Sequence, residues 1–327
     1  MQNMKVSKDI FFECQAKLDR IAFTQTEEWY KSCGYEKNYQ VDFFVNDVHN
    51  VKIACWGVIT TSKLFGRKLI LNGISSNKNL SEKEYKHFFS SLLEVGYDII
   101  DISDIDEYNV DFEVGIRRAG FTRPIGISLC PLSIIVDIEE KKYSFHRNWR
   151  RLVQKSKDAG NQFMVVTNPS MRDLEKFVSL FNALKKRKSL KFSLSKEELA
   201  ELFKSDKYKL FFVKNKDGKE VCGRIEFIHK GLVYDVYAAN SNEALASGAV
   251  YHIQEEIFNS CSDMGGVYFD YGRVSPSDDH MDNIYVSKSY SGGYVVQYNG
   301  QWHYAVSKFK DALYSFYRYG MRKTRNY

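Results

Sequence analysis

Short motifs that mark well-known chemistries are absent from this chain of 327 residues. It contains no GxGxxG, no GxxxxGKS/T, no HExxH and no GxSxG. Dinucleotide binding, P-loop nucleotide hydrolysis, zinc proteolysis and serine hydrolysis therefore lack their usual support in the sequence.

Cysteine is scarce and scattered along the chain. The six cysteines stand at positions 14, 33, 55, 130, 222 and 261, and no two of them form a CxxC pair. This spacing supports neither a disulfide framework nor a structural zinc site. It is typical of a cytosolic protein with reduced thiols.

Proline and long apolar runs are scarce as well. Four prolines, 44% hydrophobic residues and 15% aromatic residues exclude a disordered chain. Nowhere do 18 apolar residues follow one another, so we expect no membrane span. The segment Met1–Asp19 has no continuous apolar stretch, so we expect no signal peptide and a cytoplasmic location.

The length and the net charge leave several classes of protein open. A prior of about 150 residues per domain predicts two domains. Lysine and arginine number 47, against 41 aspartates and glutamates, a net charge of +6. This mild excess suits an anionic ligand such as a nucleotide, coenzyme A or RNA, but many ordinary enzymes share it.

The first half of the chain is predicted to alternate strands and helices. The predicted elements are strands at 41–45, 51–59 and 68–71, a helix at 81–95, a strand at 97–102 and a helix at 111–119. Ser81 and Glu84 have the spacing of a capping box, which fixes the start of the first helix.

The second half is predicted to repeat that order of elements, without a sequence repeat. Its elements are a helix at 145–159, strands at 162–166, 209–213, 220–229 and 232–238, and helices at 171–188 and 250–259, before a strand at 266–271. Residues 239–249 are rich in small side chains and indicate a loop. A final helix at 307–321 is expected to return to the first domain.

That loop carries a candidate anion site. Ser247, Gly248 and Ala249 stand just before the predicted helix, where free backbone N–H groups and the helix dipole favour a phosphate. We therefore assign these three residues to binding of the donor's phosphate groups. An ordinary loop explains the same residues.

Five segments, taken in order, resemble the FemABX family of peptidyltransferases, which transfer amino acids from charged tRNA to peptidoglycan precursors. They are FTQTEEWY at 23–30, GIRRAGFTRP at 115–124, RNWRR at 147–151, FDYG at 269–272 and VSKSYSGG at 286–293. Their order and spacing carry the resemblance. Ser287 and Arg273 depart from the family's pattern, which has Phe and a second Gly there, so the substrates stay open.

The resemblance implies a fold and a division of the chain. The fold class is α/β (α+β, with mixed sheets), built from two tandem GNAT-like acyltransferase domains. The first domain is expected at 1–144 plus 306–327, and the second at 145–305.

The resemblance also implies catalytic residues in the second domain. Lys288 matches the family's donor-site lysine, whose cation offsets phosphate or oxyanion charge. Tyr237 matches a substrate-facing tyrosine, and Asp270 is a candidate general base, although an activated ester donor does not require one. The structural alternatives are an exposed loop lysine, a core tyrosine and a strand-end carboxylate.

Arg187 resembles a ligand-facing arginine that holds a diphosphate with two hydrogen bonds. We group it with Asn240 and Tyr290 as acceptor-binding residues. The lysines next to Arg187 fit a solvated, basic helix end equally well, because cations are favourable at a helix C-terminus.

Arg147, Arg150 and Arg151, followed by Lys155, form a helically spaced basic cluster. We assign the three arginines to the donor site, where they would contact RNA phosphates. A charged solvent face is the alternative.

The aspartates at 98, 101, 104 and 106 resemble a metal site in composition only, and strand alternation with turns explains them better. We predict no metal, no permanently bound cofactor and no DNA partner.

Three functions remain, and the first leads. It is an aminoacyltransferase that moves an amino acid from aminoacyl-tRNA onto a nucleotide- or lipid-linked sugar or peptide precursor of the cell envelope, in peptidoglycan or surface polysaccharide. The second is an acyl-CoA-dependent N-acyltransferase of GNAT type that acts on an amino sugar. The third is a non-catalytic binding protein that keeps the fold.

Overall fold

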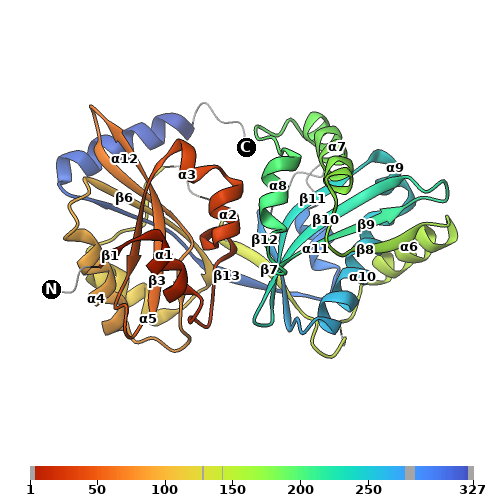
Figure 1. Cartoon of the computed structure of the whole chain (residues 1–327), viewed down its shortest axis with the longest axis horizontal. Helices are drawn as coiled ribbons and strands as arrows, with labels where there is room; N and C mark the ends of the chain where they lie inside the picture. The colour runs from red at the N-terminus through yellow and green to blue at the C-terminus, as the bar shows by residue number, and fades with distance from the viewer. Residues whose placement is uncertain (1–3, 127–128, 142, 277–283, 323–327) are drawn as a thin grey trace. The chain divides into compact units, whose positions relative to one another are not determined.

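The computed structural model describes residues 4–126, 129–141, 143–276 and 284–322, and the chain forms two compact units (Figure 1). Unit 1 comprises Met1–Tyr30, Gly34–Leu132 and Val296–Tyr327, and unit 2 comprises Lys31–Cys33 and Ser133–Val295. These limits differ from the expected domain limits, because residues 31–33 and 133–144 lie in unit 2 and residues 296–305 lie in unit 1.

A mixed sheet forms the centre of unit 1. Its strands, in spatial order, are β1 (Lys5–Val6), β2 (Gln40–Val45), β3 (Ile53–Ser62), β4 (Gly66–Asn72), β6 (Ile99–Glu107) and β13 (Tyr294–Ala305), with β5 (Ser75–Ser76) beside β3. The pair β4–β6 is parallel, while the neighbouring pairs in unit 1 are antiparallel.

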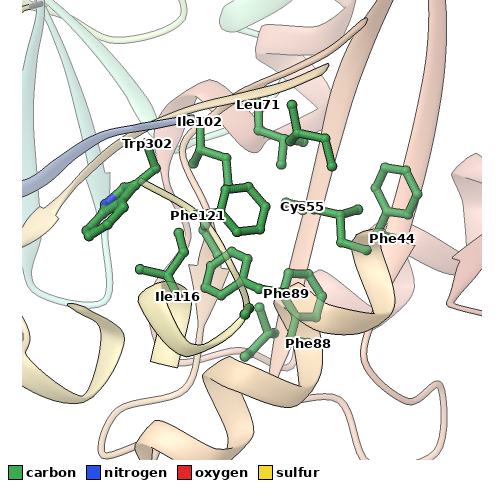
Figure 2. Packing of buried hydrophobic residues seen from close by; sticks show 14 of the residues in the cluster. Phe44, Cys55, Leu71, Phe88, Phe89, Ile102, Ile116, Phe121 and Trp302 are labelled. Atoms are coloured by element: carbon green, nitrogen blue, oxygen red, sulfur yellow. The ribbon is translucent and has the colours of Figure 1, made fainter. Parts of the chain in front are cut away.

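Helices cover both faces of this sheet. They are α1 (Lys8–Gln15), α2 (Glu27–Ser32), α3 (Tyr35–Asn38), α4 (Glu82–Leu93), α5 (Val110–Arg118) and α12 (Lys308–Arg322). Strand alternation explains the two cores, since neighbouring residues of β3 enter different clusters: Cys55 packs with Phe88 and Phe89 of α4 (Figure 2), whereas Ala54 packs with Phe11 of α1.

The predicted capping box of α4 is confirmed. Ser81 and Glu84 bond reciprocally, with the Ser81 backbone N–H 2.9 Å from a Glu84 carboxylate oxygen. Lys52 donates to the other oxygen at 2.6 Å. The hydrogen bond from Lys52, followed by those from Ser81, lowers the pKa of Glu84 to about 2.

We expect Glu84→Gln to lower the free energy of unfolding at neutral pH, because the neutral amide loses these charge-assisted bonds. A depressed folded pKa stabilises the fold above the unfolded value of 4.5, and this contribution is lost as the pH falls toward about 2. Urea unfolding at pH 7 and near pH 4 should therefore show a smaller difference between the two proteins under acid. An equal difference at both pH values would contradict this reasoning.

Unit 2 is built around a second mixed sheet. Its strands, in spatial order, are β7 (Leu132–Asp137), β12 (Tyr268–Val274), β11 (Leu232–Asn240), β10 (Glu220–His229), β9 (Tyr208–Lys214) and β8 (Gln162–Val166). The pairs from β8 to β11 are antiparallel, and β11 pairs with β12 in parallel.

The helices of unit 2 confirm some predictions and correct others. They are α6 (Arg147–Asp158), α7 (Met171–Lys188), α8 (Lys196–Leu202), α9 (Asn242–Ser247), α10 (Ala249–Asp263) and α11 (Ile284–Ser289). Helix α7 has the predicted bounds, and α8 was not predicted. The loop predicted at 239–249 was wrong, because Ser241 caps a helix there by accepting from the Ala244 backbone N–H.

Candidate functional site

Strands β11 and β12 of unit 2 pair only over part of their length. Their parallel ladder ends at the pair Tyr234–Asp270, although β11 continues to Asn240 and β12 continues to Val274. A bulge in β11 lies at the same level, since Glu226 of β10 pairs with Asp235 and the preceding Ile225 pairs with Tyr237. We call this place the β11–β12 split.

Gly272 keeps the β12 side of the split open. Its φ of +70° favours glycine, and its N–H donates at 2.8 Å to the Asp270 side chain instead of to a strand. Among the described residues, a Cβ at this position would find only the Asp235 carbonyl oxygen, at 4.0 Å. Apart from the two chain neighbours, no described side chain therefore lies within 4 Å of that Cβ position.

Charged side chains gather beside the split, on the β10 and β11 side. We call Arg224, Glu226, Asp235 and Lys288 the charged cluster. Arg224 donates to Asp235 at 2.7 Å, and the two side chains are only 13% and 7% exposed. Arg224 and Glu226 share one face of β10 because they are two residues apart on a strand.

Glu226 is the unusual member of the charged cluster. It is fully buried, and neither carboxyl oxygen has a hydrogen-bond partner in the part of the chain that the structure describes. Burial, and then the charge of Asp235, raise the pKa of Glu226 well above its ordinary value. This carboxyl group is therefore held in its neutral form more strongly than an exposed glutamate.

Lys288 lies on α11, and the alternative of an exposed loop lysine was wrong. Its side chain is partly buried, and Nζ donates to the Tyr271 carbonyl oxygen at 2.8 Å. The ammonium also lies 5.2 Å from the centroid of the Tyr271 ring. Burial lowers the pKa of Lys288, against the opposing effect of Asp235.

Asp270 stands where the ladder ends and is 2% exposed. Its Oδ1 accepts from the Ser133 hydroxyl as well as from the Gly272 N–H. Two donors on one oxygen fit the strand-end role that the sequence left open. The role of general base stays a prediction.

The structure brings Arg187 and Asn240 together. The Arg187 guanidinium bonds to the Asn240 side chain, to the Asn240 carbonyl oxygen at 3.1 Å and to Asn242 at 2.9 Å. Tyr237 lies on the same strand as Asn240, and its ring is 6.5 Å from that of Phe181, one of the buried residues of α7. These three predicted residues therefore lie together where α7 packs on β11.

Tyr290, the third predicted acceptor residue, lies elsewhere in unit 2. Its ring stacks on His146 at 4.2 Å between centroids, and its carbonyl oxygen accepts from the His146 N–H at 2.9 Å. His146 is the N-cap of α6. Tyr290 therefore lies next to α6, the basic helix, and not with Arg187 and Asn240.

Helix α6 exposes Arg147, Arg150 and Arg151, while Trp149 and Val153 face the core. None of these arginines makes an ion pair within the described parts of the chain. The first turn contains no acidic residue, although acids there would stabilise the positive end of the helix. The placement therefore favours anion binding over helix stability.

The surroundings of Ser247, Gly248 and Ala249 do not support the predicted phosphate loop. A Cβ on Gly248 would lie 2.3 Å from the Leu152 carbonyl oxygen of α6, so glycine is needed for close helix packing. The Ser247 hydroxyl accepts from Asn161 at 3.1 Å, and Ala249 is fully buried. The small residues are explained by packing between α6, α9 and α10.

Sequence reasoning missed Arg224, Glu226 and Asp235. A signal was present, because the strand 220–229 carries Arg224 and Glu226 at alternate positions, with the apolar residues Ile225 and Phe227 beside them. Within the described ranges, no group of three or more possible metal ligands occurs, and no helix is long and apolar enough to cross a membrane.

Comparisons with known proteins agree with this geometry at the level of the fold. The crystal structure of FemX matches with a TM-score of 0.75 at 14% identity, over 97% of this chain and 100% of that chain. L-PGS from Bacillus licheniformis matches with a TM-score of 0.65 at 13% identity, over 98% of each chain. A C-terminal domain of a putative lysylphosphatidylglycerol synthetase from Agrobacterium fabrum gives 0.61 at 12% identity, over 97% of this chain and 94% of that chain.

The chain has a FemABX-like double GNAT fold. The predicted fold class is thereby confirmed, as is the resemblance of fold. No protein-family model and no curated protein sequence matches the chain. Identities of this size establish the fold alone.

Asp235→Ala should lower the free energy of unfolding by about 3 kcal/mol, because it leaves the buried Arg224 cation without its partner. Chemical denaturation measures the change. Asp263→Ala is the matched control: it removes an exposed pair with Lys141 and should cost less than about 1 kcal/mol. Equal effects of the two substitutions would contradict the buried character of the Arg224–Asp235 pair.

Proposed function

We propose that this protein transfers an amino acid from aminoacyl-tRNA onto an amine of a nucleotide- or lipid-linked precursor of the cell envelope, in the cytoplasm. The fold likeness to FemX and L-PGS supports aminoacyl transfer as the class of reaction. The single observation that carries the choice of donor is the row of exposed arginines at the start of α6. Such a row suits a phosphate backbone.

The charged cluster supports the chemistry of acyl transfer. The acceptor amine attacks the ester carbonyl of the donor, a C–N bond forms, and the ester C–O bond breaks. The amine loses a proton, and the ribose hydroxyl of the tRNA leaves with one. In this proposal the Lys288 ammonium stabilises the oxyanion of the tetrahedral intermediate, in surroundings where burial strengthens the interaction.

Alignment accounts for the rest of the catalysis. The ester is already activated, so positioning the amine against it supplies much of the rate. We assign the acceptor's phosphate groups to Arg187, whose guanidinium is held in place by Asn240 and Asn242. Tyr237 borders the same place between α7 and β11, and Asp270 receives the amine's proton if a base is used.

An acyl-CoA donor would depend on a set of small residues whose presence is already explained by helix packing. The predicted site for the CoA pyrophosphate is formed by Ser247, Gly248 and Ala249, and these residues are engaged between helices. Acetyl-CoA therefore serves as the contrasting donor in the assay.

We expect transfer of a labelled amino acid from charged tRNA to an extract of envelope precursors, with Lys288→Ala reducing kcat about a hundredfold or more. Lys141→Ala, which alters an exposed lysine outside the charged cluster, is the control and should keep full activity. The absence of transfer with all amino acids and precursor pools, together with transfer from acetyl-CoA, would replace this proposal by the acyl-CoA reaction.

Replacing Arg147, Arg150 and Arg151 by alanine should raise KM for charged tRNA with little change in kcat. The slope of log affinity against log salt should decrease by roughly one for each phosphate that the variant no longer neutralises. Filter binding at several salt concentrations measures the slope.

The control for this triple variant replaces the exposed lysines Lys204, Lys216 and Lys219, which change the net charge equally but lie outside α6. If both triple variants weaken tRNA binding to the same extent, the effect is one of net charge, and the assignment of α6 fails.

A further inference from the structure

The carboxyl group of Glu226 is fully buried, and no described residue offers it a hydrogen bond. Burying a polar group without a hydrogen-bond partner destabilises the folded state, and native structures rarely contain such a group. An apolar residue of similar volume would remove this cost. The retention of a glutamate among buried residues therefore indicates a ligand that supplies the missing donors.

Asp235 extends the set of unpaired acceptors. It pairs with Glu226 across β10 and β11, and its Oδ2 accepts from Arg224 while its Oδ1 has no partner among the described residues. Three carboxyl oxygens of these two side chains thus lack donors among the described residues. An ammonium group has three N–H donors, which matches this number.

The cations of the charged cluster are directed elsewhere. Arg224 directs Nη1 to Oδ2 of Asp235, and its Nε has no hydrogen-bond acceptor in the described ranges. Lys288 directs Nζ to the Tyr271 carbonyl oxygen. Neither cation of the charged cluster therefore donates a hydrogen bond to the unpaired oxygens.

The β11–β12 split lies beside Asp235. Asp235 belongs to the part of β11 that has left the ladder, and its carbonyl oxygen is the only described atom within 4 Å of a Cβ built on Gly272. Lys288, the proposed oxyanion-stabilising residue, interacts electrostatically with Asp235 and Glu226. A group bound at the carboxylates would thus be close to the reacting carbonyl.

We propose that Glu226 and Asp235 bind the α-ammonium group of the aminoacyl donor. In an aminoacyl ester the ammonium and the carbonyl are on adjacent carbon atoms, so a group held by the two carboxylates brings the carbonyl toward Lys288. This inference rests on the proposed function and deepens it, because an acyl-CoA such as acetyl-CoA has no ammonium to offer.

The electrostatics agree with this arrangement. Burial and Asp235 raise the pKa of Glu226, and an adjacent cation favours the ionised form. The binding of an ammonium would therefore replace a neutral, unpaired acid by a hydrogen-bonded ion pair, and the proton of the acid would be released to the solvent.

The first experiment measures binding to the whole chain. Isothermal titration compares alaninamide, which has an α-ammonium, with lactamide, which has a hydroxyl in its place, and with 6-aminohexanamide, which has a distant ammonium. We expect alaninamide to bind at least tenfold more tightly than the other two. Binding of 6-aminohexanamide alone, or of none of the three, overturns the proposal.

Variants of Glu226 separate binding from stability. Glu226→Leu should keep or raise the thermal midpoint, because it removes an unpaired buried acid, and yet abolish the preference for alaninamide. Glu226→Gln should reduce that preference at least tenfold. Glu220→Gln is the control on the same strand, since Glu220 pairs with Lys176 outside the charged cluster, and it should keep the preference. A preference that survives in Glu226→Leu overturns the proposal.

A second measurement distinguishes this inference from the proposed function. Transfer is compared for the amino acid that proves active and for its α-hydroxy analogue on the same tRNA. The wild type should prefer the amino acid at least tenfold in kcat/KM, and Glu226→Leu should lose the preference. Transfer with no preference overturns the subsite alone, whereas amide binding without any transfer from tRNA overturns the aminoacyl-tRNA reaction and leaves the subsite standing.

Discussion

The incomplete pairing of β11 with β12 is the constraint on which the rest of unit 2 depends. A strand inside a sheet normally satisfies its backbone groups on both sides, and here the parallel ladder stops at Tyr234 and Asp270 while both strands continue. The bulge in β11 and the turned backbone at Gly272 separate the strands. The proposed subsite lies where this ladder ends.

The charged cluster lies beside the place where β11 and β12 separate. Ionisable groups are rarely buried unless they are paired, and Arg224 with Asp235 meets this condition. Glu226 has no hydrogen-bond partner among the described residues, and the neighbours of Lys288 are a carbonyl oxygen and an aromatic ring. A sheet that only had to be stable would place apolar residues at these positions, and this is why the proposal assigns the ligand to the charged cluster.

The rest of unit 2 divides the proposed work between separate surfaces. Helix α6, with Tyr290 against its N-cap, presents exposed cations, whereas Arg187 is fixed by two asparagines between α7 and β11. An exposed cationic row suits a long phosphate backbone, and a fixed guanidinium suits a compact diphosphate. The two proposed kinds of phosphate recognition thus differ in how firmly hydrogen bonds fix the cationic side chains.

The sequence by itself determined the elements whose cause is local. The capping box at Ser81, the periodicity of α7 and the hairpin around residues 214–220 depend on residues a few positions apart. The fold was predicted by the order of motifs over residues 23–293, which is a resemblance to a family and not a local pattern. Only the tertiary structure decided what Gly248 and Glu226 do. The small residue at Gly248 reflects the approach of Leu152, and the surroundings of Glu226 in the described chain depend on strands and a helix far apart in the sequence. Burial and partners are set by distant residues, which no local pattern encodes.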